Sequence, residues 1–334
     1  MGIFLESEKE NQIAFKTTSN SISQQARSEG FFKGKPRPFC LPLDYAEENL
    51  YPPIREDALN FFRDKRISWH QGTQGKPSNH MCDSQVCCIN FLFPFATRPN
   101  ELANLLKPIF PQIHHMLSVE DDLFVSFEWI GEKNYLGEKI SSNGTRTRGA
   151  NFTSTDAIVM FEDINQKRQV ALIEWKYTES YSSTYLGIAK SGTDRRCIYQ
   201  HLFDDPNCVV DLGKLPSVDA LYVEPFYQFM RQQFLAAKME DANELKADIV
   251  SLLHIAPRVN HDFEKITSPG LIELGKTAID VWRNLVKPQG SFISVHTEEL
   301  FGKFVSPELK DWQDYIRTRY QWVEKYSNEN NARS

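Results

Sequence analysis

Two apolar runs joined by a short polar turn constrain this chain more than any other part of its sequence. Thr155–Phe161 (TDAIVMF) and Val170–Tyr177 (VALIEWKY) are rich in β-branched and aromatic residues, and the polar stretch 162–169 separates them. Such runs predict the two strands of a hairpin. A third run of the same kind, Leu123–Ile130 (LFVSFEWI), predicts a strand before them. A sheet built on these strands is therefore the expected framework of the fold.

Three charged residues interrupt the apolar hairpin. If its turn is centred near residues 165–166, facing residues have numbers that sum to about 331, which places Asp156 opposite positions 174–176. Side chains alternate along a strand, so Glu174 and Lys176 point to one face, and a register with an even sum adds Asp156 to that face. Charges inside an apolar sheet are costly unless they are paired or bind a metal. We therefore expect two carboxylates and one lysine to meet on one face.

This set of groups suits the hydrolysis of a phosphodiester. Carboxylate oxygens are ligands that Mg²⁺ prefers, and Mn²⁺ accepts the same ligands. A neighbouring lysine can orient or deprotonate a water and stabilise the charge that develops on phosphate oxygens. The E-x-K spacing alone is not diagnostic, because it recurs at 244–246 and 308–310 in helical or helix-flanking segments. The alternative for 174–176 is a surface ion pair on an edge strand.

The segments around the hairpin predict helices on either side of it. Apolar positions and capping residues predict helices over 81–95 and 100–110 before the strands, and a helix over 225–243 after them. A strand over 249–255 follows, and a last helix begins at 306. The order helix, strand, strand, strand, helix, strand predicts a mixed α/β (α+β) fold with helices packed on a sheet.

The chain resembles the PD-(D/E)XK nuclease superfamily, whose core is αβββαβ, in Asp156, Glu174-x-Lys176 and this order of elements. It resembles, more narrowly, a bacterial family of restriction-endonuclease-like proteins. Thr155 stands where the superfamily commonly has proline. The second resemblance extends over about residues 36–260 and rests on four stretches: 80–95 (HMCDSQVCCINFLFPF), 153–156 (TSTD), 172–179 (LIEWKYTE) and 226–233 (FYQFMRQQ).

The resemblance implies roles for individual residues. Asp156 and Glu174 would be the ligands of Mg²⁺, with Mn²⁺ as a substitute, and Lys176 would be the catalytic lysine. Related nucleases often add an acid from an early helix or strand, for which Glu128 is the candidate. The helix after the strands often presents a polar residue to the site, for which Gln228 is the candidate. Three arginines are candidate DNA contacts: Arg146, Arg148 and Arg231.

The implied activity is Mg²⁺-dependent endonucleolytic hydrolysis of DNA, of a restriction or defence type. Cutting both strands needs two sites, so a homodimer is the expected assembly, whereas a partner methyltransferase or helicase is left open. Two alternatives remain at this point. One is a catalytically silent nuclease-fold module that binds DNA or regulates. The other is an interaction protein in which the E-x-K spacing is fortuitous.

Length, charge and hydropathy limit the remaining classes. The chain has 334 residues and a net charge of −6, so DNA would have to bind in a local basic cleft on an acidic body. No apolar run reaches the roughly 18 residues of a membrane span, and the N-terminus lacks a secretory signal, so a cytoplasmic protein without membrane contact is expected. The expected division is a flexible polar arm at 1–36, a nuclease-like domain at 37–260 with an insertion at about 178–224, and a helical extension at 261–334.

Histidine and cysteine clusters are weaker signals. His80-x-Cys82 with Cys87-Cys88 fits no common zinc spacing, which favours buried thiols in an apolar helix. The pair His114-His115 is expected near a helix end, and a metal or catalytic role is the less favoured interpretation. No glycine-rich phosphate loop or dinucleotide motif is present in the sequence.

Overall fold

A six-stranded mixed sheet forms the centre of the computed structural model, which describes residues 2–138, 145–150 and 152–324. The tail over 328–334 (NENNARS), for which the sequence predicts fraying, lies outside these residues. The strand order is β3-β5-β6-β7-β8, and β4 pairs with the same edge of β5 as β3 does. β5 and β6 are the predicted antiparallel hairpin, whereas β6, β7 and β8 run parallel. The strands are β3 (Ile113–Leu117), β4 (Val125–Trp129), β5 (Thr155–Asp163), β6 (Arg168–Trp175), β7 (Ile249–Ala256) and β8 (Phe292–His296), with a separate hairpin of β1 (Gly30–Phe32) and β2 (Lys35–Arg37).

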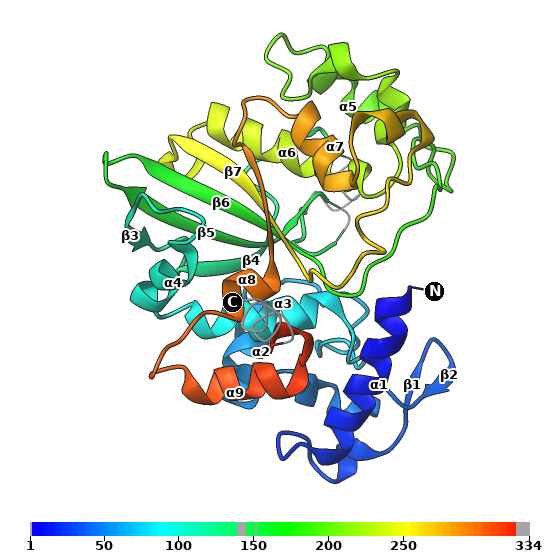
Figure 1. Cartoon of the computed structure of the whole chain (residues 1–334), viewed down its shortest axis with the longest axis vertical. Helices are drawn as coiled ribbons and strands as arrows, with labels where there is room; N and C mark the ends of the chain where they lie inside the picture. Colours follow the sequence, from blue (N-terminus) through cyan, green and yellow to red (C-terminus); the bar gives the residue numbers. More distant parts are fainter. Residues whose placement is uncertain (1, 139–144, 151, 325–334) are drawn as a thin grey trace, which may run out of the picture.

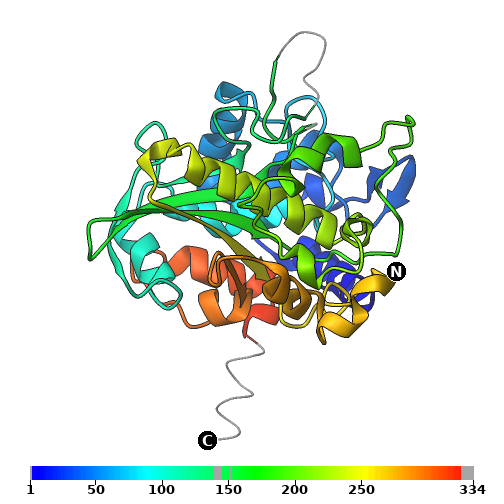
Figure 2. The ribbon, with the colours of Figure 1, turned by 90° about the horizontal axis from the view of Figure 1, so that it is seen from above.

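Helices cover both faces of the sheet (Figure 1). One layer holds α5, α6 and α7, and α6 lies across the sheet when the molecule is seen from above (Figure 2). The opposite layer holds the N-terminal helices and the last two helices. The helices are α1 (Ile3–Thr18), α2 (Arg55–Asp64), α3 (Ser84–Leu92), α4 (Pro99–Leu106), α5 (Arg196–Phe203), α6 (Phe226–Asp241), α7 (Ala278–Leu285), α8 (Thr297–Phe301) and α9 (Lys310–Arg319).

The two faces of the sheet bury two separate cores. On β5 and β6, Val159 and Ile173 pack with α3 and α4, whereas Ile158 and Leu172 pack with α6 and α7. Strands buried on both faces read as continuous apolar runs, which is why the hairpin shows no strict polar alternation. The predicted mixed α+β fold is confirmed, and even-numbered residues of β5 and β6 face α6.

The prediction of a flexible arm over 1–36 is wrong for its described part. Residues 3–18 form α1, which packs against the C-terminal part of the chain and buries three polar side chains: Glu8, Gln12 and Lys16. These side chains find hydrogen-bond partners far away in sequence. Lys16 donates to the carbonyls of Ser28 and Cys40 at 3.1 and 3.0 Å. Polar residues that are buried and satisfied by distant partners leave no apolar pattern to detect.

A buried arginine ties this layer together. Arg319, fully buried at the end of α9, donates to the side chains of Gln12 and Tyr315 at 3.1 and 2.7 Å, and to the backbone oxygen and side chain of Asn49. It thereby joins the segment after residue 310 to α1 and to the loop before α2.

Elements of the sheet layers that the sequence did not predict include β3, β8 and α7. β8 joins the sheet beside β7, so the segment at 261–334 is more than a helical extension. The domain boundaries at 36/37 and 260/261 stay predictions. Within the described residues, no helix combines the length and the apolar character that crossing a membrane requires.

Candidate active site

Three carboxylates lie in one transverse row at an end of the sheet. The register pairs Phe127 with Ala157 and Trp129 with Thr155, which places Glu128 opposite Asp156. Ala157 pairs with Ile173, so the next position along places Asp156 opposite Glu174. The facing numbers sum to an even value, which is the condition for Asp156 to share the face of Glu174 and Lys176. Asp156, Glu174 and Lys176 therefore share the face covered by α6.

Backbone geometry sets the position of two of these acids. The backbone N–H of Trp175 donates to Asp156 Oδ2 at 2.7 Å, the one hydrogen bond that Asp156 makes within the described chain. Glu128 has φ of +52°, inside the left-handed region that side chains other than glycine adopt at a cost. Its carboxylate is fixed by Gln85 Nε2 at 2.6 Å and Ser154 Oγ at 2.8 Å. Strain held in place by surrounding contacts is common at functional sites.

Lys176 lies just beyond the end of β6, and both its backbone and its side chain are hydrogen-bonded. Its backbone N–H donates to Ile255 of β7 at 2.8 Å. Its ammonium forms an ion pair with Glu174 Oε1 and donates to Gln228 Oε1 at 2.6 Å. Lys176 is 4% exposed and Glu174 is 2% exposed. The surface ion pair considered as the alternative does not describe this pair, because both side chains are buried.

Two glutamines of the site were missed by the sequence analysis. Gln232, one helical turn after Gln228 on α6, donates to Glu174 Oε2 and, at 3.0 Å, to the carbonyl of Ser154. Gln232 follows Gln228 at the i, i+4 spacing that places two side chains on one helix face, and this spacing is the sequence signal that could have revealed Gln232. Gln85, in the first turn of α3, has no local signal because its partner Glu128 is 43 residues away.

The row of acids has a marked electrostatic imbalance. Burial, followed by the charges of Glu174 and Glu128, raises the pKa of Asp156 well above its usual value. Burial also raises the pKa of Glu128. Burial opposes the charged form of Lys176, but the surrounding charges together, with Glu174 the strongest of them, outweigh burial and raise the pKa of the lysine. One ammonium thus faces three acidic groups, so a further cation would stabilise the site.

The donor set fits a hard divalent metal. Asp156 keeps one carboxylate oxygen without a partner in the described chain, and Gln232 Oε1 is a buried oxygen that also lacks one. Carboxylate and amide oxygens, completed by water, are the ligands that Mg²⁺ takes in proteins. Asp156 and Glu174 are the residues placed to hold such an ion, with Glu128 and Gln232 beside them.

The three candidate arginines lie in different environments. Arg148 is bound to Glu120 at 2.9 Å and to the carbonyl of Phe127, so it supports β4. Arg146 donates to the carbonyls of Ile130 and Gly131. Arg231, on α6, stacks over the ring of Tyr227 with 4.5 Å to the centroid and donates to Thr153 Oγ1 at 3.1 Å. Of these three, Arg231 lines a cavity on the side of the sheet covered by α6.

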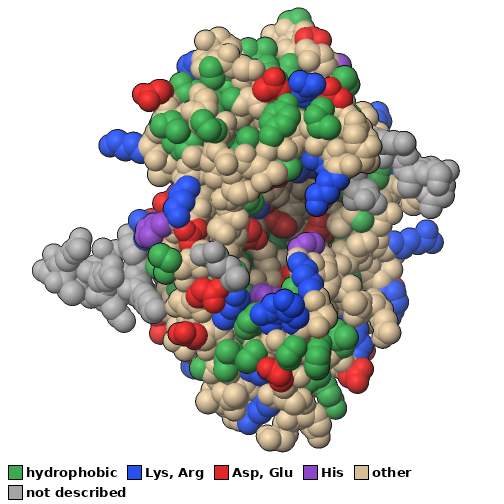
Figure 3. All heavy atoms as spheres, turned by 90° about the vertical axis from the view of Figure 1, so that its right-hand side faces the viewer, with side chains coloured by type: hydrophobic (Ala, Val, Ile, Leu, Met, Phe, Trp, Pro, Cys, Tyr) green, Lys and Arg blue, Asp and Glu red, His purple; other side chains and the backbone are tan. Residues whose placement is uncertain are grey.

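That cavity has a volume of about 580 Å³ and opens beside the N-terminal half of α6. Its lining includes Arg195, Arg231 and Glu224, and the backbone N–H of Gln228 donates to Glu224 at 3.1 Å, which connects the cavity to the Lys176 environment. Neither arginine has a carboxylate within 4.0 Å in the described residues. The face in Figure 3 is hollowed between two halves of the molecule, with acidic side chains inside and lysine, arginine and histidine around the rim.

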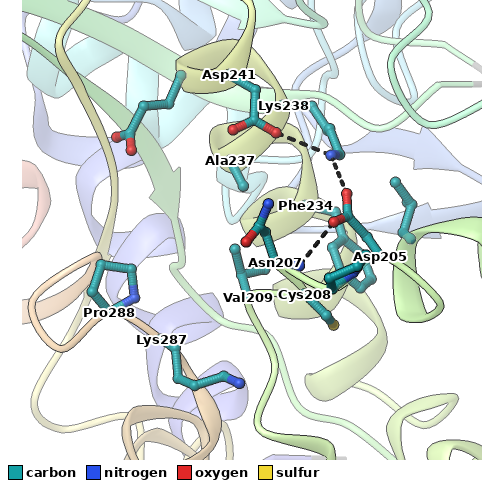
Figure 4. A pocket seen from close by; sticks show the side chains of 13 residues that line it. Asp205, Asn207, Cys208, Val209, Phe234, Ala237, Lys238, Asp241, Lys287 and Pro288 are labelled. Atoms are coloured by element: carbon teal, nitrogen blue, oxygen red, sulfur yellow. Dashed lines mark hydrogen bonds and ion pairs between the residues drawn. The ribbon is translucent and has the colours of Figure 1, made fainter.

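A separate cavity lies at the other end of α6. It has a volume of about 350 Å³, and Lys238 in its wall is paired with Asp205 at 2.7 Å and Asp241 at 3.0 Å (Figure 4). This lysine is neutralised by two acids, so this cavity lacks the excess of like charge that marks the row at Asp156.

Comparison with protein families identifies the family to which the chain belongs. A family model described as "Restriction Endonuclease associating with ARP" matches residues 9–321. The chain belongs to this family. Searches of curated proteins and of solved structures gave no match. Membership in the restriction-endonuclease family supports a nuclease role of the restriction type, with DNA as the substrate that the family implies. The match includes the whole row of carboxylates, Lys176, Gln228 and Gln232.

Proposed function

We propose that this chain is a divalent-metal-dependent endodeoxyribonuclease of the PD-(D/E)XK type. The observation that carries the proposal is the row of Glu128, Asp156 and Glu174 across three adjacent strands, with Lys176 on the same face. A sheet that bears three acids and one lysine at one end has the groups that hydrolysis of a phosphodiester requires. Family membership supports the same reaction class.

Each side chain has a distinct task in this proposal. Asp156 and Glu174 hold the ion, which when bound acidifies a water and neutralises charge on the scissile phosphate. Lys176 orients the attacking water and stabilises negative charge on the phosphate oxygens. Gln228 and Gln232 fix the two partners of the Lys176–Glu174 pair, so both are positioning residues. In the cavity beside the site, Arg231 is placed to contact a neighbouring DNA phosphate.

The test is cleavage of mixed plasmid and phage DNA by the full chain with Mg²⁺, Mn²⁺ or EDTA. Lys176→Gln should lower the rate by about 100-fold or more, since removal of a group that stabilises transition-state charge has this effect. Lys310→Gln is the matched control, because Lys310 belongs to another E-x-K sequence and pairs with Asp314 on the surface of α9. Equal metal-dependent cleavage by wild type and Lys176→Gln would remove the assigned role.

A second function is favoured by one specific contact. Both oxygens of Glu174 are engaged, one by Lys176 and one by Gln232. If these contacts persist when DNA and metal are present and outcompete an ion for the lone pairs of Glu174, the chain acts as a DNA-binding or regulatory module. Titration with Mn²⁺ separates the two functions. The enzyme requires Mn²⁺ binding that is lost in Glu174→Gln, whereas the module requires DNA binding in the absence of Mn²⁺ binding.

A further inference from the structure

A β-bulge on the edge strand β3 brings two histidines and a glutamate together. Ile113 pairs with Asp163, and His115 pairs with Glu162, so β3 advances two residues while β5 advances one. His114 is the extra residue of the bulge. Neighbouring side chains of a regular strand point to opposite faces, but a bulge sets two residues against one. The side chains of His114 and His115 consequently approach each other and Glu162.

We propose that His114, His115 and Glu162 form a binding site for a transition metal ion of the Zn²⁺ class. Their ligand atoms lie within 4.8 Å of one another. The two Nδ1 atoms are 3.1 Å apart. An ion about 2.05 Å from each nitrogen would subtend an angle of about 100° between them, close to the tetrahedral value. The imidazoles are therefore already spaced for chelation.

The carboxylate needs only a small adjustment. Glu162 Oε1 is 4.0 Å from Nδ1 of His114 and 3.9 Å from Nδ1 of His115. A tetrahedral site requires about 3.4 Å between such ligand atoms. A rotation of the Glu162 side chain that moves Oε1 by roughly half an ångström completes the set. The side chain of Glu162 is 27% exposed and has room to rotate.

Charge and accessibility agree with a metal ligand role for all three residues. Among the described residues, no lysine or arginine lies within 4.0 Å of the Glu162 carboxylate, although Arg168 is its neighbour across the β5–β6 pair. The side chains of His114 and His115 are 65% and 49% exposed, so an ion can reach them from solvent. Two imidazoles and one carboxylate select zinc-like ions over Mg²⁺, which prefers oxygen ligands.

The site is distinct from the proposed nuclease centre. Glu162 lies six residues along β5 from Asp156, a separation of roughly 20 Å at ~3.3 Å per residue. An ion held by His114, His115 and Glu162 would bridge β3 and β5 and thereby stabilise the edge of the sheet. Three protein ligands leave a fourth position for water. The inference stands whether or not the chain cleaves DNA.

The test is a titration of metal-stripped full chain with Zn²⁺ against a chromophoric chelator, with melting temperature as a second readout. We expect the wild type to bind one more equivalent than His115→Ala and His114→Ala, and its melting temperature to rise more with Zn²⁺. Glu162→Gln should weaken this equivalent by about tenfold or more. His261→Ala is the matched control, because His261 is an exposed histidine with its Nδ1 3.6 Å from Glu264.

Zinc bound elsewhere does not obscure the result, because the comparison is between variants that differ only at the bulge. All four substitutions are at solvent-exposed or partly exposed side chains, and melting without metal checks that each variant folds. The proposal is overturned if His114→Ala and His115→Ala bind as many equivalents as the wild type and respond equally to Zn²⁺. It is also overturned if His261→Ala loses the same equivalent.

Discussion

Neutralising Asp156 should make the metal-free protein more stable, although most substitutions at buried polar positions destabilise. Asp156→Asn keeps an oxygen that accepts from the Trp175 N–H but removes a charge that faces Glu174 and Glu128. Facing side chains of paired strands are about 5 Å apart. At that distance and an effective dielectric constant of about 20, each pair of carboxylate charges repels by about 3 kcal/mol.

Two effects reduce this figure. Lys176 attracts the Asp156 charge and offsets one of the two repulsions. The new amide also brings N–H groups that must find partners in a partly buried place, at a cost of about 1 kcal/mol. We therefore expect the free energy of unfolding to increase by about 1–2 kcal/mol at pH 7.5. In a chain of this size that corresponds to a rise in melting temperature of roughly 1–3 °C.

The sign of the pH dependence follows from the raised pKa of Asp156. As the pH rises above about 4, the unfolded chain releases this proton while the folded protein retains it, so the stability of the wild type falls until the raised pKa is passed. The advantage of Asp156→Asn should consequently be small at pH 4.5 and larger at pH 7.5. Differential scanning calorimetry in EDTA measures both values.

A matched control lies on the same strand. Asp163, at the other end of β5, accepts the backbone N–H groups of Lys167 and Asn165 at 2.9 and 2.7 Å, and these contacts lower its pKa. Asp163→Asn should therefore lower the melting temperature. With 100-fold excess of Mg²⁺ over its dissociation constant, the wild type should gain about 2.7 kcal/mol, and Asp156→Asn should gain much less. A loss of stability in metal-free Asp156→Asn would refute the reasoning about the row.

Two further predictions concern groups held by buried hydrogen bonds. Glu128→Gln should raise the dissociation constant for Mn²⁺ by about 10–100-fold, since groups around metal ligands tune affinity by this amount; isothermal titration measures it, and the exposed Glu132→Gln should leave it unchanged. Arg319→Met should lower the free energy of unfolding by about 3 kcal/mol or more, because the acceptors of Asn49 and Gln12 lose their donor inside the protein. Arg317→Met, on the exposed side of the same helix, is the control in urea unfolding, and an equal loss in both variants would contradict the role of Arg319.

The sequence was informative where local pattern determines structure. Alternation placed Glu174 and Lys176 on one face, and the turn position placed Asp156 opposite them, because the β5–β6 hairpin is closed by a short turn and its register is local. The parity of the register, which decides the face of Asp156, came from the structure. The apolar run at 81–95 predicted a buried helix, and α3 followed by a 3₁₀ turn occupies it. These elements depend on contacts within a few tens of residues.

Other features depend on contacts that one sequence does not encode locally. α1 buries polar residues, and the burial of Gln12 becomes explicable only through Tyr177 and Arg319. The adjacent histidines of β3 were expected near a helix end. The bulge at His114 interrupts the alternation that marks a strand, so the sequence does not show that they lie on one. Gln85 reaches Glu128 from a different layer of the fold. The site was thus predictable in its charged residues and in Gln228, and not in Gln85 and Gln232.

The position of Arg319 in the chain has a consequence for biosynthesis. Its acceptors on Gln12 and Asn49 leave the ribosome long before the arginine itself is made. β8, which completes the sheet beside β7, also emerges late. The layer beneath the sheet therefore cannot reach its native hydrogen bonding during most of translation. A nascent chain would lack the finished scaffold behind the Asp156 row until Arg319 has been made.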